Sequence, residues 1–168
     1  MRPLKLRIQA FGSYVDEQVL DFETALADAP FLLIHGATGS GKTTILDAIV
    51  FALYGESSGD IREGAMLRSS TAPPDRTTEV EYVFSLGQRR YRVLRSPAYS
   101  RMSRGKMTRR AATGQLFRLP DIGKTGEEKL LAANITDVSE HISQLIGFDA
   151  DQFSQVVLLP QGQFQRFL

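Results

Sequence analysis

The stretch "HGATGSGKTTILDAIVFALYG", His35–Gly55, joins a glycine-rich loop to a segment with helical periodicity. Residues 36–43 match the pattern of a glycine, four residues, and then Gly-Lys-Ser/Thr. From Lys42, apolar residues recur at helical spacing up to Gly55, a residue type that commonly ends helices. Before the loop, the apolar run "FLLIHG" predicts a central strand covered on both faces. Strand, loop and helix in this order predict an α/β fold built around a phosphate-binding loop.

The glycine-rich loop predicts a nucleotide-binding site. Its glycines allow successive backbone N–H groups to converge at a helix N-terminus, where they can bind a β-phosphate. We expect the Lys42 ammonium to lie between the β- and γ-phosphates and the Thr43 hydroxyl to ligate Mg²⁺. Thr44 is expected to contact the α-phosphate. The predicted binding residues are Gly36, Ala37, Thr38, Gly39, Ser40, Gly41, Lys42, Thr43 and Thr44.

Length and composition favour one compact domain. The chain has 168 residues, of which 42% are hydrophobic and 23% charged, as is ordinary for globular proteins. No apolar run approaches the roughly 18–20 residues needed to span a bilayer, and the first ten residues lack the apolar centre of a signal peptide. There is no cysteine and there are only two histidines, which argues against disulfides and zinc. We therefore expect a cytoplasmic protein without a membrane partner.

Alternating apolar residues predict several further strands. "LKLRIQAF" and "QVLDF" are expected to form strands near the start of the chain. "TTEVEYVFSLGQRRYRVLRS" predicts a hairpin that turns at Gly87-Gln88. The basic segment "SRMSRGKMTRRAATG" is expected to be a mobile loop, followed by a strand "QLFRL". These strands predict an antiparallel β-subdomain over about residues 77–119.

Two helices are predicted near the end of the chain. The first, "DVSEHISQLIG", is expected to be capped by Thr136 and to end at Gly147. The second, "ADQFSQV", is short and is expected to be capped by Asp149. No internal repeat or linker indicates a second domain.

Positive charge is concentrated in one segment. Residues 88–110 contain nine of the 20 basic residues and none of the 19 acidic ones. Such a segment can track the phosphates of DNA, but its arginines could equally pair with the acidic remainder of the chain. No base-reading motif is present, so a DNA contact would be independent of sequence. The candidate DNA-binding residues are Arg89, Arg90, Arg101, Arg104, Lys106, Arg109 and Arg110.

The acid that nucleotide hydrolysis requires is missing from the sequence. It normally closes an apolar strand beside the phosphate loop. "QVLDF", ending near Asp21, and "FRLPD", ending at Asp121, come nearest, and neither is an apolar strand with an acidic pair. The sequence therefore predicts an incomplete hydrolytic site.

Three segments resemble the N-terminal part of the ATPase head of the SbcC family. This family comprises bacterial DNA-repair nuclease subunits related to the SMC chromosome proteins. The segments are "LKLRIQAFGSYVDEQVLDF", "GATGSGKTTILDAIVFALYGE" and "VVLLPQGQFQRFL". The resemblance implies an α/β P-loop NTPase fold in which residues 1–168 form the N-terminal lobe of an ABC-type ATPase head, with a mixed sheet and the antiparallel β-subdomain. In SMC proteins proper, a basic residue occupies the turn that here reads Gly12-Ser13. No aromatic residue is evidently placed to stack on adenine, so the choice of ATP rests on the resemblance.

The same resemblance assigns the end of the chain. Residues 158–163 correspond to a Q-loop in which Gln161 would contact Mg²⁺ and sense the γ-phosphate, and residues 163–168 to the start of a coiled-coil helix. It also implies a C-terminal lobe that follows the coiled coil and carries the signature motif, the Walker B acid and the His switch. The chain alone is then expected to bind ATP weakly and to hydrolyse little.

The resemblance further implies partners. Two copies of the head would dimerise around ATP and gate an SbcD-type nuclease that acts on double-stranded DNA ends in the nucleoid. Two alternatives remain open on the sequence. One is a kinase of a small metabolite, with the basic segment as a lid over phosphates. The other is a structural lobe that binds DNA or a partner without nucleotide.

Overall fold

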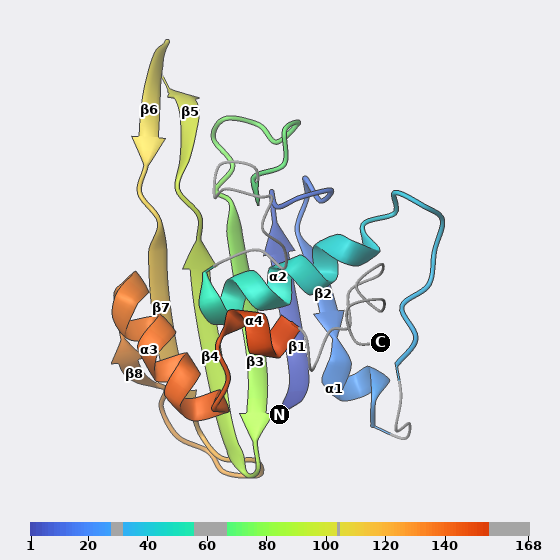
Figure 1. Ribbon diagram of the computed structural model, residues 1–168, viewed down its shortest axis with the longest axis vertical. Helices are drawn as coiled ribbons and strands as arrows, with labels where there is room; N and C mark the ends of the chain where they lie inside the picture. Colours follow the sequence, from blue (N-terminus) through green and yellow to red (C-terminus); the bar gives the residue numbers. More distant parts are fainter. Residues whose placement is uncertain (28–31, 56–66, 104, 155–168) are drawn as a thin grey trace.

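The computed structural model describes residues 1–27, 32–55, 67–103 and 105–154. Its main element is a six-stranded sheet of order β2-β1-β3-β4-β7-β8, in which every neighbouring pair is antiparallel (Figure 1). The predicted α/β class is confirmed, with a sheet that is mainly antiparallel. Its strands are β1 (Arg2–Gln9), β2 (Gln18–Asp21), β3 (Glu79–Leu86), β4 (Arg89–Ser96), β7 (Thr113–Leu119) and β8 (Lys129–Ala132).

Helices cover one face of this sheet. The longest is α2 (Lys42–Tyr54), which crosses the strands and contacts β3, β4 and two other helices, α3 (Ile135–Ile146) and α4 (Ala150–Phe153) (Figure 1). A fourth helix, α1 (Phe22–Ala25), follows β2 and contacts β1. The P-loop helix α2 is therefore enclosed between the sheet and the helices that follow later in the chain.

The core lies between α2 and the helix-covered face of the sheet. Successive residues of a strand point to opposite faces, so one residue in two contributes to this core. The helix brings small residues, Ala48 and Ala52, which allow its backbone to approach the strands closely, together with Phe51 and Leu53. The sheet contributes Leu6, Ile8, Val80, Tyr82, Phe84, Tyr91, Val93 and Leu116, all essentially buried.

The prediction of a buried central strand before the glycine-rich loop is wrong. Residues 32–36 form neither strand nor helix, and the Leu33 side chain is 80% exposed. A strand covered on both faces needs neighbouring strands to satisfy its backbone, and among the described residues none lies beside this segment. The apolar run therefore remains exposed in this chain.

Local signals placed the helix ends well, with one exception. Helix α2 ends at Gly55 and α3 at Gly147, both in the left-handed conformation, and Asp149 caps α4 with a capping box, as predicted. The N-terminal cap of α3 is Asn134 rather than Thr136, because the Asn134 side chain accepts a hydrogen bond from the Asp137 N–H.

The prediction of a loop for the basic segment is also wrong. Residues 99–103 and 106–110 form a second, two-stranded sheet of β5 (Tyr99–Ser103) and β6 (Lys106–Arg110). This β5–β6 hairpin continues from β4 and returns into β7, so it projects beyond the ends of these two strands (Figure 1). The strands of the predicted β-subdomain, in contrast, belong to the same sheet as β1 and β2.

A buried arginine fastens the end of α2. The Arg95 side chain, only 1% exposed, points from β4 into the core. Its Nε donates to the Ala52 carbonyl at 2.8 Å, and its Nη2 donates to the Leu53 carbonyl and to the Ser139 hydroxyl of α3, each at 3.0 Å. The last carbonyls of a helix lack intrahelical partners and carry negative partial charge, so a guanidinium satisfies and stabilises them. Arg95 thus joins α2, β4 and α3.

Alkaline pH is expected to destabilise the fold through Tyr54. Its hydroxyl donates to the Phe148 carbonyl at 3.1 Å, and burial, followed by the nearby Asp149 carboxylate, raises the pKa of Tyr54 to about 12. The unfolded chain ionises this phenol at its usual pKa of about 10, so the free energy of unfolding should fall as pH rises above 10. Burial also raises the pKa of Tyr82, which adds to the loss.

The measurement is urea unfolding between pH 8 and pH 11.5, followed by circular dichroism. In Tyr54→Phe, the loss of stability above pH 10 should be smaller than in the natural protein, with the contribution of Tyr82 remaining. An equal loss in both proteins would contradict the assignment to Tyr54.

Candidate nucleotide-binding site

The glycine-rich loop leads directly into the first turn of α2. Residues 36–40 are exposed, and the Ser40 N–H donates to the Ala37 carbonyl at 3.1 Å, which closes a turn. Gly39 and Gly41 have φ values of +85° and +90°, which glycine adopts without strain. The first N–H groups of a helix have no intrahelical partners. The loop and α2 together therefore present backbone donors suited to an anion.

Lys42 adds a positive charge to this loop. Its Nζ donates to the carbonyls of Gly36 and Ala37, each at 2.8 Å, so the ammonium lies against the beginning of the loop. Thr43 follows on the first turn of α2 and is exposed. An ammonium, an accessible hydroxyl and converging backbone amides are the groups that a nucleotide phosphate with Mg²⁺ requires, so these residues fit such a ligand.

The turn between β1 and β2 contacts the end of the loop and the first turn of α2. Thr44 is buried, and its hydroxyl lies 3.1 Å from the hydroxyl of Ser13. The Tyr14 hydroxyl donates to the Gly41 carbonyl at 3.3 Å. The sequence did not indicate this contact of Tyr14, because no motif links a tyrosine in that turn to the loop. The α-phosphate contact expected of Thr44 stays a prediction.

Gly12 of this turn packs closely against α2. Its φ is +55°, and a Cβ added there would lie 2.4 Å from Cγ2 of Thr44. We expect Gly12→Ala to lower the free energy of unfolding by about 3 kcal/mol, from backbone strain and overpacking together, and to weaken nucleotide binding because Thr44 must move. Urea unfolding and nucleotide titration measure the two effects.

Gly123→Ala is the matched control. Gly123 also has a positive φ, +75°, but a Cβ there meets nothing within 4 Å. Only the backbone cost, about 1–2 kcal/mol, should appear, with nucleotide affinity unchanged. Equal losses of stability in the two variants would mean that the added Cβ at residue 12 does not clash with Thr44.

Three sequence predictions lie outside the described residues. They are the Q-loop at residues 158–163 with Gln161, the start of a coiled coil at residues 163–168, and Arg104 within the basic segment. The described residues hold no group of three or more acidic or histidine side chains that could bind a metal ion.

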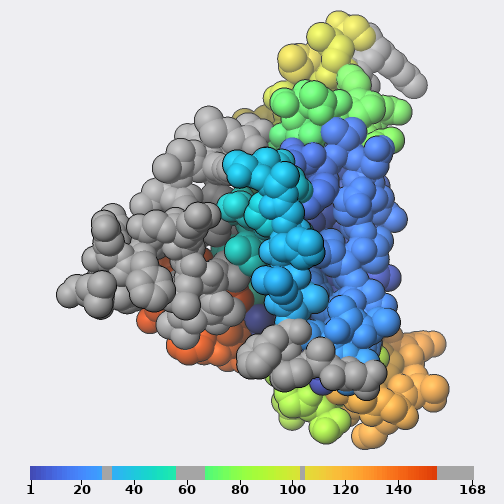
Figure 2. All heavy atoms as spheres, turned by 90° about the vertical axis from the view of Figure 1, so that its right-hand side faces the viewer, coloured from blue at the N-terminus to red at the C-terminus, as the bar shows by residue number. Residues whose placement is uncertain are grey.

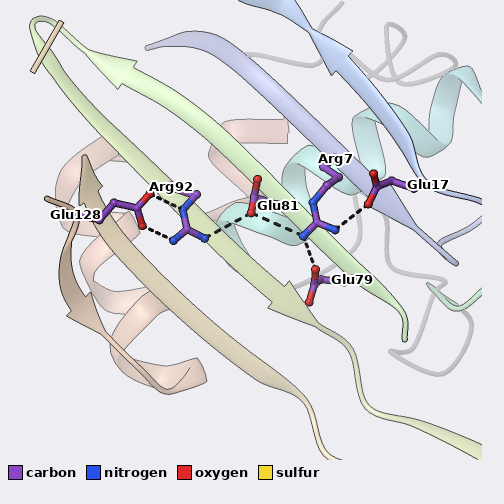
Figure 3. Close-up of polar contacts among 6 residues, drawn as sticks. All are labelled: Arg7, Glu17, Glu79, Glu81, Arg92 and Glu128. Atoms are coloured by element: carbon purple, nitrogen blue, oxygen red, sulfur yellow. Dashed lines mark hydrogen bonds and ion pairs between the residues drawn. The ribbon is translucent and has the colours of Figure 1, made fainter. Parts of the chain in front are cut away.

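Three of the four arginines on β4 are either paired with a carboxylate or buried. Arg90 lies 3.7 Å from the carboxylate of Glu23, and Arg95 is buried in the core. Arg92 belongs to a row of ion pairs on the face of the sheet opposite the helices (Figure 3). Of the candidate DNA-binding residues on β4, only Arg89 is fully exposed. The sequence predicted one continuous charged surface for these residues. In the structure, some of them are paired or buried and others are exposed.

The row of ion pairs crosses three strands. Arg92 of β4 pairs with Glu81 of β3 at 3.4 Å and with Glu128, and Glu81 lies 3.7 Å from Arg7 of β1 (Figure 3). Arg7 also pairs with Glu79 and, at 3.2 Å, with Glu17. Cross-strand pairs of opposite charge stabilise neighbouring strands modestly. The acidic residues of the body therefore satisfy these arginines locally.

The cations of the β5–β6 hairpin differ from those of the sheet. Lys106, Arg109 and Arg110 are exposed, and no ion pair involves them among the described residues. Arg101 donates at 3.5 Å to a backbone carbonyl, that of Asp75, and not to a carboxylate. The hairpin projects from one end of the molecule (Figure 2). It is the part of the basic segment whose charge remains available.

Comparison with known proteins identifies the family. A family profile described as "AAA domain" matches residues 5–168. The chain belongs to the AAA domain family. Membership of this family implies nucleotide use. Within the part of this AAA domain that the structure describes, no helix combines the length and apolar character needed to cross a membrane.

The AAA domain also has close relatives among nuclease proteins. It is 43% identical to the SbcC subunit of nuclease SbcCD from Vibrio cholerae, 38% identical to that of Lactococcus lactis and 36% identical to that of Staphylococcus aureus. Each alignment covers the whole chain and 16% of the relative, so the chain spans about a sixth of the length of these proteins. The resemblance to the SbcC family that the sequence predicted is confirmed.

Proposed function

We propose that this chain is the ATP-binding half of the ATPase subunit of an SbcC–SbcD-type nuclease that processes DNA double-strand ends. The observation that carries the proposal is the exposed loop 36–40 that leads into α2, with the Lys42 ammonium against the loop carbonyls. It occurs in a chain 36–43% identical to proteins named as the SbcC subunit of nuclease SbcCD.

In this proposal, the chain supplies the binding of the triphosphate. The amides of the loop and the first turn of α2 bind the β-phosphate, and Lys42 neutralises charge between the β- and γ-phosphates. Thr43 and Gln161 would hold Mg²⁺, which would offset the negative charge of the phosphates. Ser13 and Tyr14 act indirectly, because they fix Thr44 and the Gly41 carbonyl in place.

Hydrolysis is assigned to groups outside these residues. A C-terminal lobe of the same protein would bring the Walker B acid and His switch, and a second copy of the head would bring its signature motif to the bound ATP. The exposed apolar run at Leu32–Ile34, beside the phosphate loop, supports a further lobe that covers it and pairs with its backbone. The length of the relatives leaves ample chain for such a lobe.

DNA contact is assigned to the β5–β6 hairpin. Its described cations have no carboxylate partners among the described residues, whereas Arg90 and Arg92 of β4 do. Cations that are not engaged in internal ion pairs can replace the counterions of a phosphate backbone, which gives salt-dependent binding without sequence preference. ATP-driven closure of two heads on DNA would then gate an SbcD-type nuclease.

ATP turnover tests the proposal. The full-length protein with its nuclease partner should hydrolyse ATP at about 1 s⁻¹ or faster and cleave DNA ends, and both activities should stop when Mg²⁺ is chelated. Residues 1–168 alone should hydrolyse little, because the acid is supplied elsewhere. Turnover by this piece at the rate of the full-length protein would refute the division of the site.

A further inference from the structure

The β5–β6 hairpin has two chemically different faces. In an antiparallel pair, directly opposed residues share a face. Met102 of β5 opposes Met107 of β6. The pair Ser100 and Arg109 is two residues away on each strand, so these four residues lie on one face. On the other face, Arg101 opposes Thr108, which lies between Lys106 and Arg110 on β6.

The two methionines are unusually placed for a solvent-facing ribbon. They are cross-strand partners, and their side chains are 52% and 69% exposed. Every residue of β6 is exposed, so the body of the protein does not cover this face (Figure 2). Two adjacent, flexible apolar side chains on a projecting hairpin are suited to contact with an apolar surface of a partner.

The charge of the hairpin indicates what that partner is. Arg109 shares the face of the methionines, Arg101, Lys106 and Arg110 lie on the other face, and residues 99–110 contain no acidic residue. A ligand must therefore be anionic on its outside and apolar where the methionines reach. Duplex DNA meets both requirements, because phosphates line both walls of each groove and the stacked faces of the bases are apolar where an inserted side chain opens a base step.

We propose that the β5–β6 hairpin enters a groove of duplex DNA, where its cations contact phosphates and Met102 and Met107 contact the bases. The inference deepens the proposed DNA role and rests on it. Two-stranded ribbons are used by proteins to enter DNA grooves, and methionine is among the apolar residues that proteins insert between base steps. Apolar contacts read no donor or acceptor pattern, so the binding is independent of sequence.

The test separates charge from apolar contact. Binding of the full-length protein to a labelled 30-base-pair duplex is followed by fluorescence anisotropy across a range of KCl concentrations. The double variant R109Q/R110Q should reduce the slope of log affinity against log salt by about 1.8. The double variant M102S/M107S should weaken binding about tenfold with the slope unchanged.

Leu130→Ser provides the matched control for the methionines. Leu130 is 50% exposed, on β8 and away from the hairpin, so the same loss of exposed apolar surface there should leave DNA affinity unchanged. Circular dichroism establishes that each variant is folded.

The outcomes distinguish the two proposals. If the charge variant changes the slope but the methionine variant binds normally, the hairpin contacts phosphates only and the groove insertion is wrong. If the methionine variant instead loses binding to the nuclease partner, the apolar face contacts protein, which also overturns the inference. If neither variant affects DNA, the proposed DNA role of the hairpin fails too, while ATP turnover judges the ATPase role separately.

Discussion

Replacing Lys42 by alanine is expected to lower the affinity of the full-length protein for ATP by about 10- to 100-fold. The ammonium lies against the first residues of the phosphate loop, where it can exchange its contacts with the Gly36 and Ala37 carbonyls for phosphate oxygens. Charge-assisted hydrogen bonds contribute about 1.5–3 kcal/mol each, which corresponds to this range. Calorimetric titration with a non-hydrolysable ATP analogue measures the loss.

Lys124→Ala is the control for the loss of one positive charge. Lys124 is 73% exposed and lies 3.6 Å from Asp121, in the turn that follows β7. Its removal should leave ATP affinity unchanged, and DNA affinity should be unchanged in Lys42→Ala. Normal ATP binding by a folded Lys42→Ala protein would favour the alternative of a structural lobe that works without nucleotide.

Replacing Arg95 by alanine is expected to lower the free energy of unfolding by about 3–5 kcal/mol. The variant leaves the carbonyls of Ala52 and Leu53 buried without the guanidinium and opens a cavity between α2, β4 and α3. A buried polar group that loses its partner costs about 1–3 kcal/mol, and the cavity adds to this. Urea unfolding of the chain at pH 7 measures the difference.

Arg92→Ala is the matched control, since Arg92 is on the same strand but on the opposite face. Its ion pairs with Glu81 and Glu128 are partly exposed, so its loss should cost about 1 kcal/mol or less. Arg95→Lys keeps the charge but not the planar fork that reaches two carbonyls, and should fall between the two alanine variants. Equal losses in Arg92→Ala and Arg95→Ala would mean that Arg95 does not hold the end of α2.

The parts of the fold that depend on residues close together in the sequence were predictable. The limits of α2 follow from the glycine-rich loop and from Gly55, and the turn at Gly87 marks the β3–β4 hairpin. The sequence pattern could not show that residues 32–35 do not form the expected strand. Strand formation depends on neighbouring strands, and the pattern does not reveal whether these are present. The β5–β6 hairpin lacks apolar alternation, and its pairing follows from the continuation of β4 and β7.

The candidate site was predictable to the same extent. The loop and Lys42 belong to one continuous motif, so their proximity required no tertiary information. Ser13 and Tyr14 come about 30 residues earlier and meet the loop only in the folded chain. In the sequence, Arg95 is one of the nine basic residues of segment 88–110. Its burial depends on carbonyls that are 42 and 43 positions away. Charge composition cannot distinguish such an arginine from one that faces solvent.

Helix α2 is anchored at both ends. Ser13 and Tyr14 hold its first turn, and Arg95, together with Ser139, holds its last. Sliding or tilting the helix within the lobe would break one of these attachments. In the proposed function, a change of nucleotide state would therefore be transmitted as rigid-body rotation of the lobe, and the projecting hairpin would act as a lever that enlarges this rotation at its tip.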